Sequence, residues 1–153
     1  MNTRILTFLL AMVIMAITPA CTSISTDSGP NWPLIETTAH TSVKWSTKIV
    51  LDNNPSYAES AAEVGAAIAT VFSGVPTAKT IQAHLVAILP KLTDADAAIL
   101  AAALMDTYGA YVAATGKTEL ISTDEHVEAL VKAITNGIAD GVILHRASRP
   151  VAT

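Results

Sequence analysis

The chain has 153 residues, a length that suits one domain. Hydrophobic residues make up 51% of it and charged residues only 14%, which excludes an acidic disordered chain, because such chains have few apolar groups and high charge. The formal net charge is −4. A domain of that sign repels the phosphates that a nucleic-acid binder must neutralise, so we expect no nucleic-acid partner.

The first twenty residues have the pattern of a secretory signal. Arg4 supplies a positive charge, residues 5–17 form an apolar run that only Thr7 interrupts, and Ala20 is a small residue at its exit. The apolar run is about 13 residues long, whereas a transmembrane helix needs roughly 20. We therefore predict a signal peptide over residues 1–20 and not a membrane span.

Cys21, the only cysteine, directly follows that signal. The segment Thr18-Pro19-Ala20-Cys21 resembles the lipobox of bacterial lipoproteins, although that family usually has Leu in place of Thr18 and Ala or Ser in place of Pro19. The resemblance implies cleavage before Cys21 and acylation of its thiol and new amine, so Cys21 is the predicted lipidation site. Thr22, where inner-membrane lipoproteins commonly carry Asp, implies the outer membrane, facing the periplasm. The alternative is a secreted protein cut after Ala20, with Cys21 as a free thiol.

Residues 21–52 are predicted to form the lipidated cysteine and a flexible tether. Residues 22–42 are rich in Ser, Thr and Pro and show no period, which is typical of a linker. Trp32 within them is interpreted as part of a partly ordered tether, with packing onto the domain or the bilayer interface as the alternatives. Residues 43–51 fit both a strand and a helix face. Because no second strand is evident to pair with them, a short helix is favoured.

Four amphipathic segments then predict a small all-α bundle over residues 53–146, with a flexible tail over 147–153. A helix of residues 43–51 would make it a five-helix bundle. Expected helix starts are a Ser56/Glu59 capping box, Thr77, Thr93 and a Ser122/Glu125 capping box; expected ends are Gly74, Pro90, Gly116 and about His145. The predicted inner faces are Tyr57, Ala61, Val64, Ile68, Val71 and Phe72; Ile81, Leu85, Ile88, Leu89 and Leu92; Ala97, Leu100, Ala103, Leu104, Thr107, Tyr108 and Tyr111; and Val127, Leu130, Val131, Ile134, Ile138 and Val142.

Gly137 and Gly141 form a small-xxx-small element in the last segment. Such spacing lets two helices approach closely. Two interpretations remain open: close packing between two helices of one bundle, and a homodimer contact through Gly137 and Gly141.

The sequence shows no pattern that predicts catalysis, a cofactor or a metal. Asp124, Glu125, His126 and Glu128 crowd one helix start, but acids in a first turn are ordinary partners of the helix dipole. His145 is expected to complement the dipole at a helix C-terminus. We therefore predict no catalytic residues, no cofactor and no metal site.

The predicted function is that of a non-catalytic lipoprotein of the bacterial cell envelope. Its expected partners are the membrane, through the lipid anchor, and an envelope protein that the sequence does not identify. In its organisation the chain is similar to small lipoproteins of Gram-negative bacteria and their phages, some of which accompany lysis genes. The alternatives are a secreted soluble enzyme or inhibitor and a membrane-active, holin-like helical protein.

Overall fold

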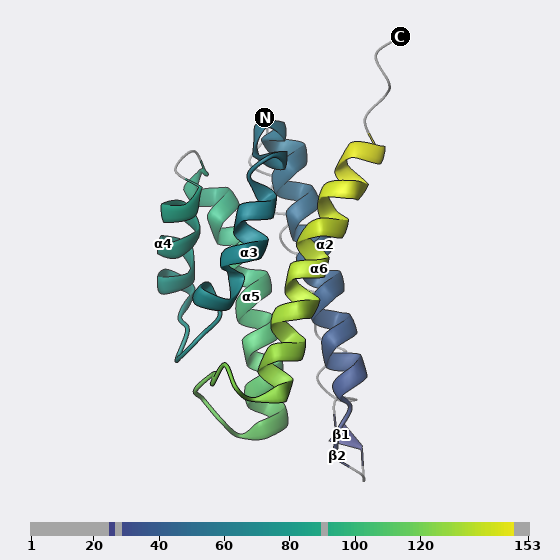
Figure 1. Ribbon diagram of the computed structural model, residues 1–153, viewed down its shortest axis with the longest axis vertical. Coiled ribbons are helices and arrows are strands. Elements are labelled where there is room, and N and C mark those ends of the chain that lie inside the picture. The colour runs from purple at the N-terminus through teal and green to yellow at the C-terminus, as the bar shows by residue number, and fades with distance from the viewer. Residues whose placement is uncertain (1–24, 27–28, 90–91, 149–153) are drawn as a thin grey trace, which may run out of the picture.

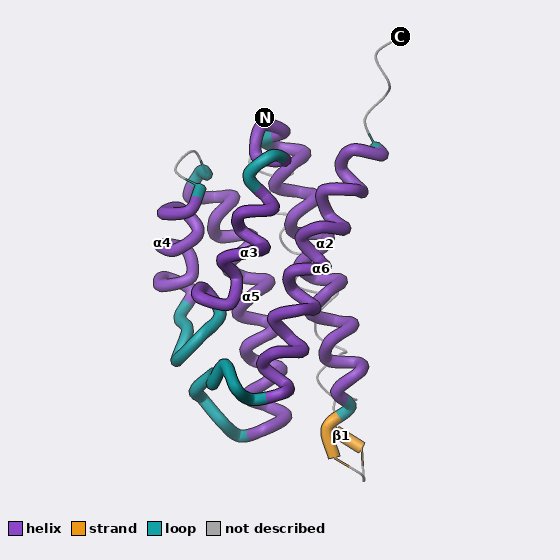
Figure 2. Tube along the Cα trace, in the orientation of Figure 1, coloured by secondary structure: helices purple, strands orange, loops and turns teal. Residues whose placement is uncertain are grey.

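The computed structural model describes residues 25–26, 29–89 and 92–148. Its α-helices are α2 (Trp32–Asn53), α3 (Ala61–Val71), α4 (Ala78–Ile88), α5 (Asp94–Thr115) and α6 (Glu125–Ala147), with a 3₁₀ turn, η2 (Pro55–Ala58) (Figures 1 and 2). A small antiparallel hairpin, β1 (Ser25–Thr26) and β2 (Gly29–Pro30), precedes α2 with Ser25 paired to Pro30. The prediction of an all-α bundle is confirmed, and in the described part of the chain it has five α-helices.

The five helices form a ring around one core. α2 packs against α6 on one side and α5 on the other, α4 packs against α5 and α3, and α3 closes the ring against α6 (Figure 1). α2 and α6 run parallel, because Gly137 of α6 lies against His40 and Gly141 lies against Lys44 and Thr47. α2 and α6 are therefore close neighbours in the ring although they are far apart in sequence.

The predicted tether is wrong over most of its length. α2 begins at Trp32 and runs for 22 residues, so it includes the expected helix of residues 43–51 and eleven further residues before it. Six of its residues are buried in the bundle: Ile35, Ala39, Val43, Thr47, Val50 and Leu51. The bundle therefore starts at residue 32 and not at residue 53.

The start of α2 explains why its first half resembled a linker. The side chain of Asn31 accepts a hydrogen bond from the Leu34 N–H at 3.2 Å, which caps the helix. Pro33 stands in the first turn, where the missing N–H of proline would have no helical partner in any case. A proline that indicated a linker in the sequence is thus a helix-start residue in the fold.

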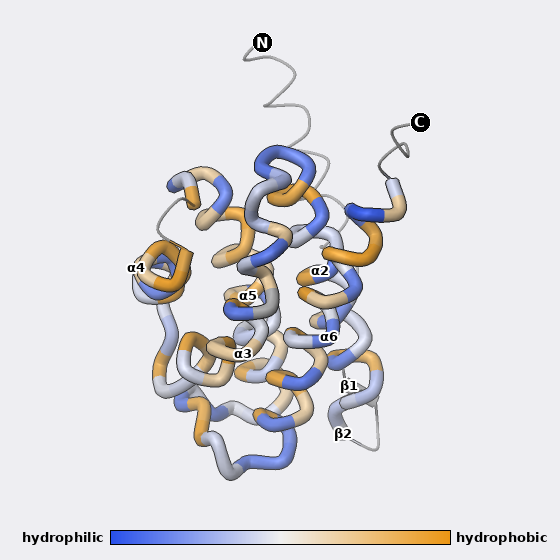
Figure 3. The backbone as a smooth tube through the Cα atoms, turned by 45° about the horizontal axis from the view of Figure 1, so that its top comes forward, coloured by the Kyte–Doolittle hydropathy of each residue, from blue (hydrophilic) through white to orange (hydrophobic). Residues whose placement is uncertain are grey.

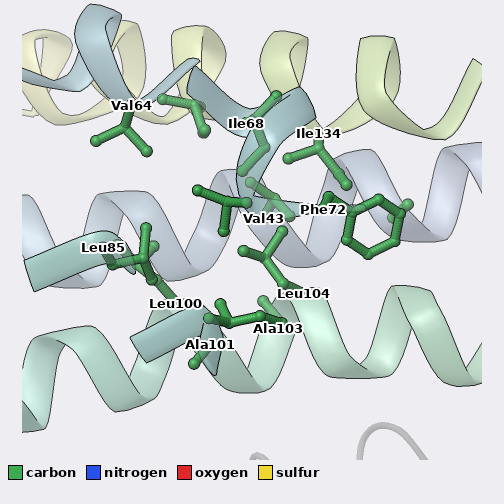
Figure 4. Packing of buried hydrophobic residues seen from close by; sticks show 14 of the residues in the cluster. Val43, Val64, Ile68, Phe72, Leu85, Leu100, Ala101, Ala103, Leu104 and Ile134 are labelled. Carbon is green, nitrogen blue, oxygen red and sulfur yellow. The ribbon is translucent and has the colours of Figure 1, made fainter. Parts of the chain in front are cut away.

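The core consists of aliphatic side chains from all five helices, with Tyr57, Phe72 and Tyr111 as its aromatic members. Figure 4 shows Val43 of α2, Ile68 of α3 and Ile134 of α6 converging over Leu104 of α5. Of the predicted inner-face residues only Ile88, Tyr108, Val131 and Val142 are partly exposed; the others are buried. Polar and apolar stretches alternate along the helices, as the periodicity predicted (Figure 3).

Two of the four predicted helix starts are confirmed. Thr77 caps α4 in a capping box with Thr80, and Thr93 caps α5. The Ser56/Glu59 capping box is wrong, because Pro55–Ala58 forms a 3₁₀ turn and α3 begins only at Ala61. The Ser122/Glu125 box is also wrong: Asp124 caps α6 by accepting from the His126 N–H at 3.0 Å.

A buried carboxylate joins the end of α2 to the start of α5. Asp96 accepts hydrogen bonds from Asn54 Nδ2 at 2.6 Å, from Thr93 Oγ1 at 2.7 Å and from Asn53 Nδ2 at 3.3 Å. A buried charge is tolerated when several donors satisfy it. This network fixes the turn of the chain at one end of the bundle.

The structure supports the first interpretation of Gly137 and Gly141, close packing between two helices of one bundle. A Cβ at residue 137 would lie 2.6 Å from the His40 carbonyl oxygen, and one at residue 141 would lie 2.7 Å from the Lys44 carbonyl oxygen. These glycines are therefore buried where α6 approaches the backbone of α2 in the same chain. The interpretation of this pair as a homodimer contact does not fit that burial.

Candidate functional site

The predicted lipidation site, Cys21, lies outside the described residues. The described chain begins at Ser25 in the β1–β2 hairpin, which leads directly into α2. The hairpin lies at the end of the bundle where α2 and α6 begin and α5 ends (Figure 1). We call this end, with the loops of residues 72–77 and 116–124, the entry end.

Trp32 packs onto the bundle at the entry end. Its indole stacks on the imidazole of His126, with ring centroids 3.6 Å apart and planes 7° from parallel. The ring of Tyr111 lies 6.4 Å away at a tilt of 53°. The interpretation of Trp32 as part of a partly ordered tether is therefore wrong, and its alternative, packing onto the domain, is the observed one.

Two opposite charges of this end, Lys117 and Asp124, are paired. Lys117 Nζ donates to Asp124 at 2.8 Å, and the Tyr111 hydroxyl lies 3.4 Å from the same carboxylate oxygen. The hydrogen bond from Lys117 holds the pKa of Asp124 below its ordinary value, and Asp124 in turn raises the pKa of Lys117. Asp124 also caps α6, so this carboxylate has a structural role at the start of that helix.

The two loops of the entry end are joined to each other. Gly74 and Leu120 exchange backbone hydrogen bonds, 3.1 Å from Gly74 N to Leu120 O and 2.7 Å from Leu120 N to Gly74 O. Leu120 is buried. Val75 and Ile121, the residues that follow in each loop, are exposed at 61% and 48%. The entry end therefore presents two large apolar side chains to the outside.

A cleft of about 380 Å³ lies at the opposite end of the bundle. Its lining is Pro55, Ser56, Ala58, Glu59, His145 and Arg146. His145 is 2% exposed, and its Nδ1 lies 2.8 Å from Asp52 Oδ1. Asp52 is also paired with Lys48, one turn earlier on α2. Hydrogen bonds from Lys48 and then from His145 hold the pKa of Asp52 below its ordinary value.

This cleft has the residue types of a hydrolase, but the described geometry does not join them. Asp52 orients His145 through Nδ1, as a carboxylate does for a catalytic imidazole. The other ring nitrogen, Nε2, is buried and has no hydrogen-bond partner among the described residues. Among those residues, Ser56 makes no hydrogen bond to His145. The chemistry that this arrangement supports is therefore orientation of a buried imidazole, which fastens α6 to α2.

His145 and His40 show what sequence reasoning missed. His40 Nε2 lies 3.0 Å from Asp140 Oδ2, so both histidines join α2 to α6 through a carboxylate on the other helix. Each pair spans about 100 positions of sequence, and the hydrogen-bonded partner is visible only once residues 32–52 are recognised as a helix. Had α2 been predicted, its spacing of His40, Lys48 and Asp52 could have suggested a second polar seam.

No group of three or more His, Cys, Asp or Glu residues in the described part of the chain could hold a metal ion. Among the described helices, α5 is long and apolar enough to cross a membrane by length and composition, although a third of the relevant window is buried inside the bundle. No family model, curated protein or solved structure matches the chain.

Proposed function

We propose that this chain is an exported lipoprotein of the bacterial cell envelope, held at the membrane through Cys21, and that it acts by contact and not by catalysis. The observation that carries the proposal is the order of the parts. The signal-like residues 1–20 and the single cysteine come first, and the described helices all follow, from Trp32 onwards. Cleavage before Cys21 would therefore remove none of these helices.

The length of the connection supports a position close to the bilayer. Ten residues lie between Cys21 and Trp32. Even a fully extended chain spans at most about 3.3–3.6 Å per residue, and the β1–β2 hairpin turns part of this segment back on itself. The linker between the anchor and the bundle would therefore be short, and not the long tether that the sequence predicted.

An exposed apolar face on α2 supports a role in contact with a protein partner. Trp45 is 51% exposed and Ile49, one turn later, is 42% exposed. Exposed aromatic and aliphatic side chains on one helix face are typical of protein interaction sites. We propose this face as the contact surface for the envelope partner.

Replacement of the cysteine tests the anchor. We expect Cys21→Ser to move the protein from the membrane fraction to the soluble fraction while its helical circular-dichroism spectrum stays unchanged, because the bundle begins after the anchor. Two acyl chains hold a protein stably, whereas one alone is marginal. Mass spectrometry of the wild-type N-terminus supplies the control. A soluble wild-type protein with an unmodified thiol would contradict the proposal.

The composition of α5 favours one second candidate, a membrane-active protein that inserts this helix. In that case the bundle must open, because α5 packs against α2 and α4. Leakage of dye from vesicles on addition of the wild-type protein would support this candidate. Intact vesicles that carry bound protein would support the anchored bundle.

A further inference from the structure

We propose that Val75 and Ile121 form a membrane-contacting tip, which inserts into the bilayer interface beside the lipid anchor and holds the bundle upright. This inference rests on the proposed function, since the anchor brings the tip to the bilayer. Its occupant is the lipid surface itself. The tip consists of side chains from two loops far apart in sequence.

The backbone pairing holds the loops that carry these two side chains together. Gly74 and Leu120 form an isolated hydrogen-bonded antiparallel pair, and Val75 and Ile121 are the residues that follow them in the two loops. Leu120 is buried, whereas Val75 and Ile121 are exposed at 61% and 48%. Two exposed apolar side chains are therefore held next to one pair of hydrogen-bonded residues.

The course of the chain decides what would cover this patch. The described residues begin with the β1–β2 hairpin at the entry end, and Cys21 precedes Ser25 by four positions. Figure 1 shows the loop of residues 116–124 at the same end of the longest axis as that hairpin, and the loop of residues 72–77 in the same half of the molecule. An anchor attached there brings the loops, and not the opposite end with the cleft, towards the bilayer.

Charge at the entry end favours apolar insertion over electrostatic adsorption. Lys117 is already paired with Asp124, and the exposed Glu119 directly precedes Leu120 in the same loop. Such a surface gains nothing from an anionic leaflet, in contrast to a polybasic one. The suitable probe is therefore a vesicle of neutral phosphatidylcholine and phosphatidylethanolamine.

The test places a fluorophore at the tip and at a matched position away from it. Val75→Cys and Ile121→Cys are compared with Ile143→Cys, because Ile143 on the outer face of α6 is 62% exposed and also aliphatic. The full chain is produced in bacteria, where acylation blocks the Cys21 thiol, and each new thiol carries an environment-sensitive dye. In vesicles with nitroxide-labelled lipid, we expect at least twofold stronger quenching and a blue shift at residues 75 and 121 only. Equal quenching at all three positions, or none at any, would overturn the tip.

A second anchor separates this inference from the proposed function. The same three variants are prepared with Cys21→Ser and a histidine tag before residue 21, held on nickel-chelating lipid in neutral vesicles. An unmodified Cys21 in the native protein would defeat the proposed function, whereas quenching confined to residues 75 and 121 on nickel lipid would still support the tip. Unquenched tip labels on nickel lipid would refute the tip, even if Cys21 proves to be acylated.

Discussion

At the scale of single residues, the contact between Asp52 and His145 joins α2 to α6 through a buried imidazole. The imidazole is almost fully buried and places Nδ1 2.8 Å from Asp52 Oδ1, while its Nε2 already lacks a described partner. A buried polar group that loses its remaining partner keeps the full cost of having left water. The carboxylate of Asp52, by contrast, is partly exposed.

We expect Asp52→Ala to destabilise the protein by about 1–3 kcal/mol, because His145 would then be buried without a hydrogen bond. Urea denaturation followed by circular dichroism measures the change. Lys48→Ala is the matched control: it removes the i, i+4 pair with Asp52 and should cost only about 0.3–0.5 kcal/mol. Equal losses from both variants would mean that the buried imidazole does not depend on Asp52.

The lowered pKa of Asp52 predicts the pH at which this contribution disappears. A carboxyl whose pKa is lower in the folded than in the unfolded protein adds stability above the unfolded value, here 3.8, and loses it as the pH falls through the folded pKa. The difference in unfolding free energy between wild type and Asp52→Ala should therefore shrink as the pH falls below 3.8. Urea titrations at a series of acidic pH values test this, and a difference that grows on acidification would refute it.

At the scale of elements, the seam between α2 and α6 depends on two glycines. Ideal Cβ positions at Gly137 and Gly141 meet backbone carbonyl oxygens at 2.6 and 2.7 Å, and backbone cannot move aside as a flexible side chain can. Gly109 of α5 is the opposite case, since nothing lies within 4 Å of its Cβ position. Replacing glycine by alanine should therefore lower the stability of the protein in α6 and raise it in α5.

We expect Gly137→Ala and Gly141→Ala each to destabilise by about 1–3 kcal/mol, the usual cost of overpacking. Gly109→Ala should stabilise by up to about 1 kcal/mol, because alanine is the better helix former. Thermal denaturation of the three variants measures the contrast. Stabilisation by Gly137→Ala would show that α6 does not approach α2 so closely in solution.

At the scale of the whole molecule, α2 closes the ring of helices. It packs against both α5 and α6, and its removal would expose their inner faces to water. Buried apolar area is the main term that offsets the conformational entropy of a small domain. A bundle limited to residues 53–146, as the sequence suggested, lacks that cover.

We expect a fragment of residues 53–148 to lose cooperative unfolding, whereas residues 29–148 should unfold in one transition at the same urea concentration as the mature chain. Circular dichroism across a urea titration distinguishes the two. A cooperative transition in the shorter fragment would mean that α3 to α6 form a complete bundle without α2.

The sequence by itself determined the helical class, the four segments within residues 53–146 and nearly all of their inner faces. These depend on local facts: the three- and four-residue recurrence of apolar side chains and caps such as Thr77 and Thr93. The lipidation site, Cys21, likewise comes from local pattern alone and stays a prediction.

Only the tertiary structure decided what residues 32–52 do and which side chains meet. Linkers as well as helix starts contain residues such as Asn31, Pro33 and the threonines of α2. That segment is a helix because Ile35, Ala39 and Val43 are buried against helices about 60 to 100 residues away. The pairs His40–Asp140 and Asp52–His145 follow from that packing, and the pairing of Gly74 with Leu120 likewise joins segments that are far apart in sequence. Contacts between distant segments depend on how the helices pack in three dimensions. The hydrophobic periodicity of one segment shows which of its faces is buried, but it does not show which other segment covers that face.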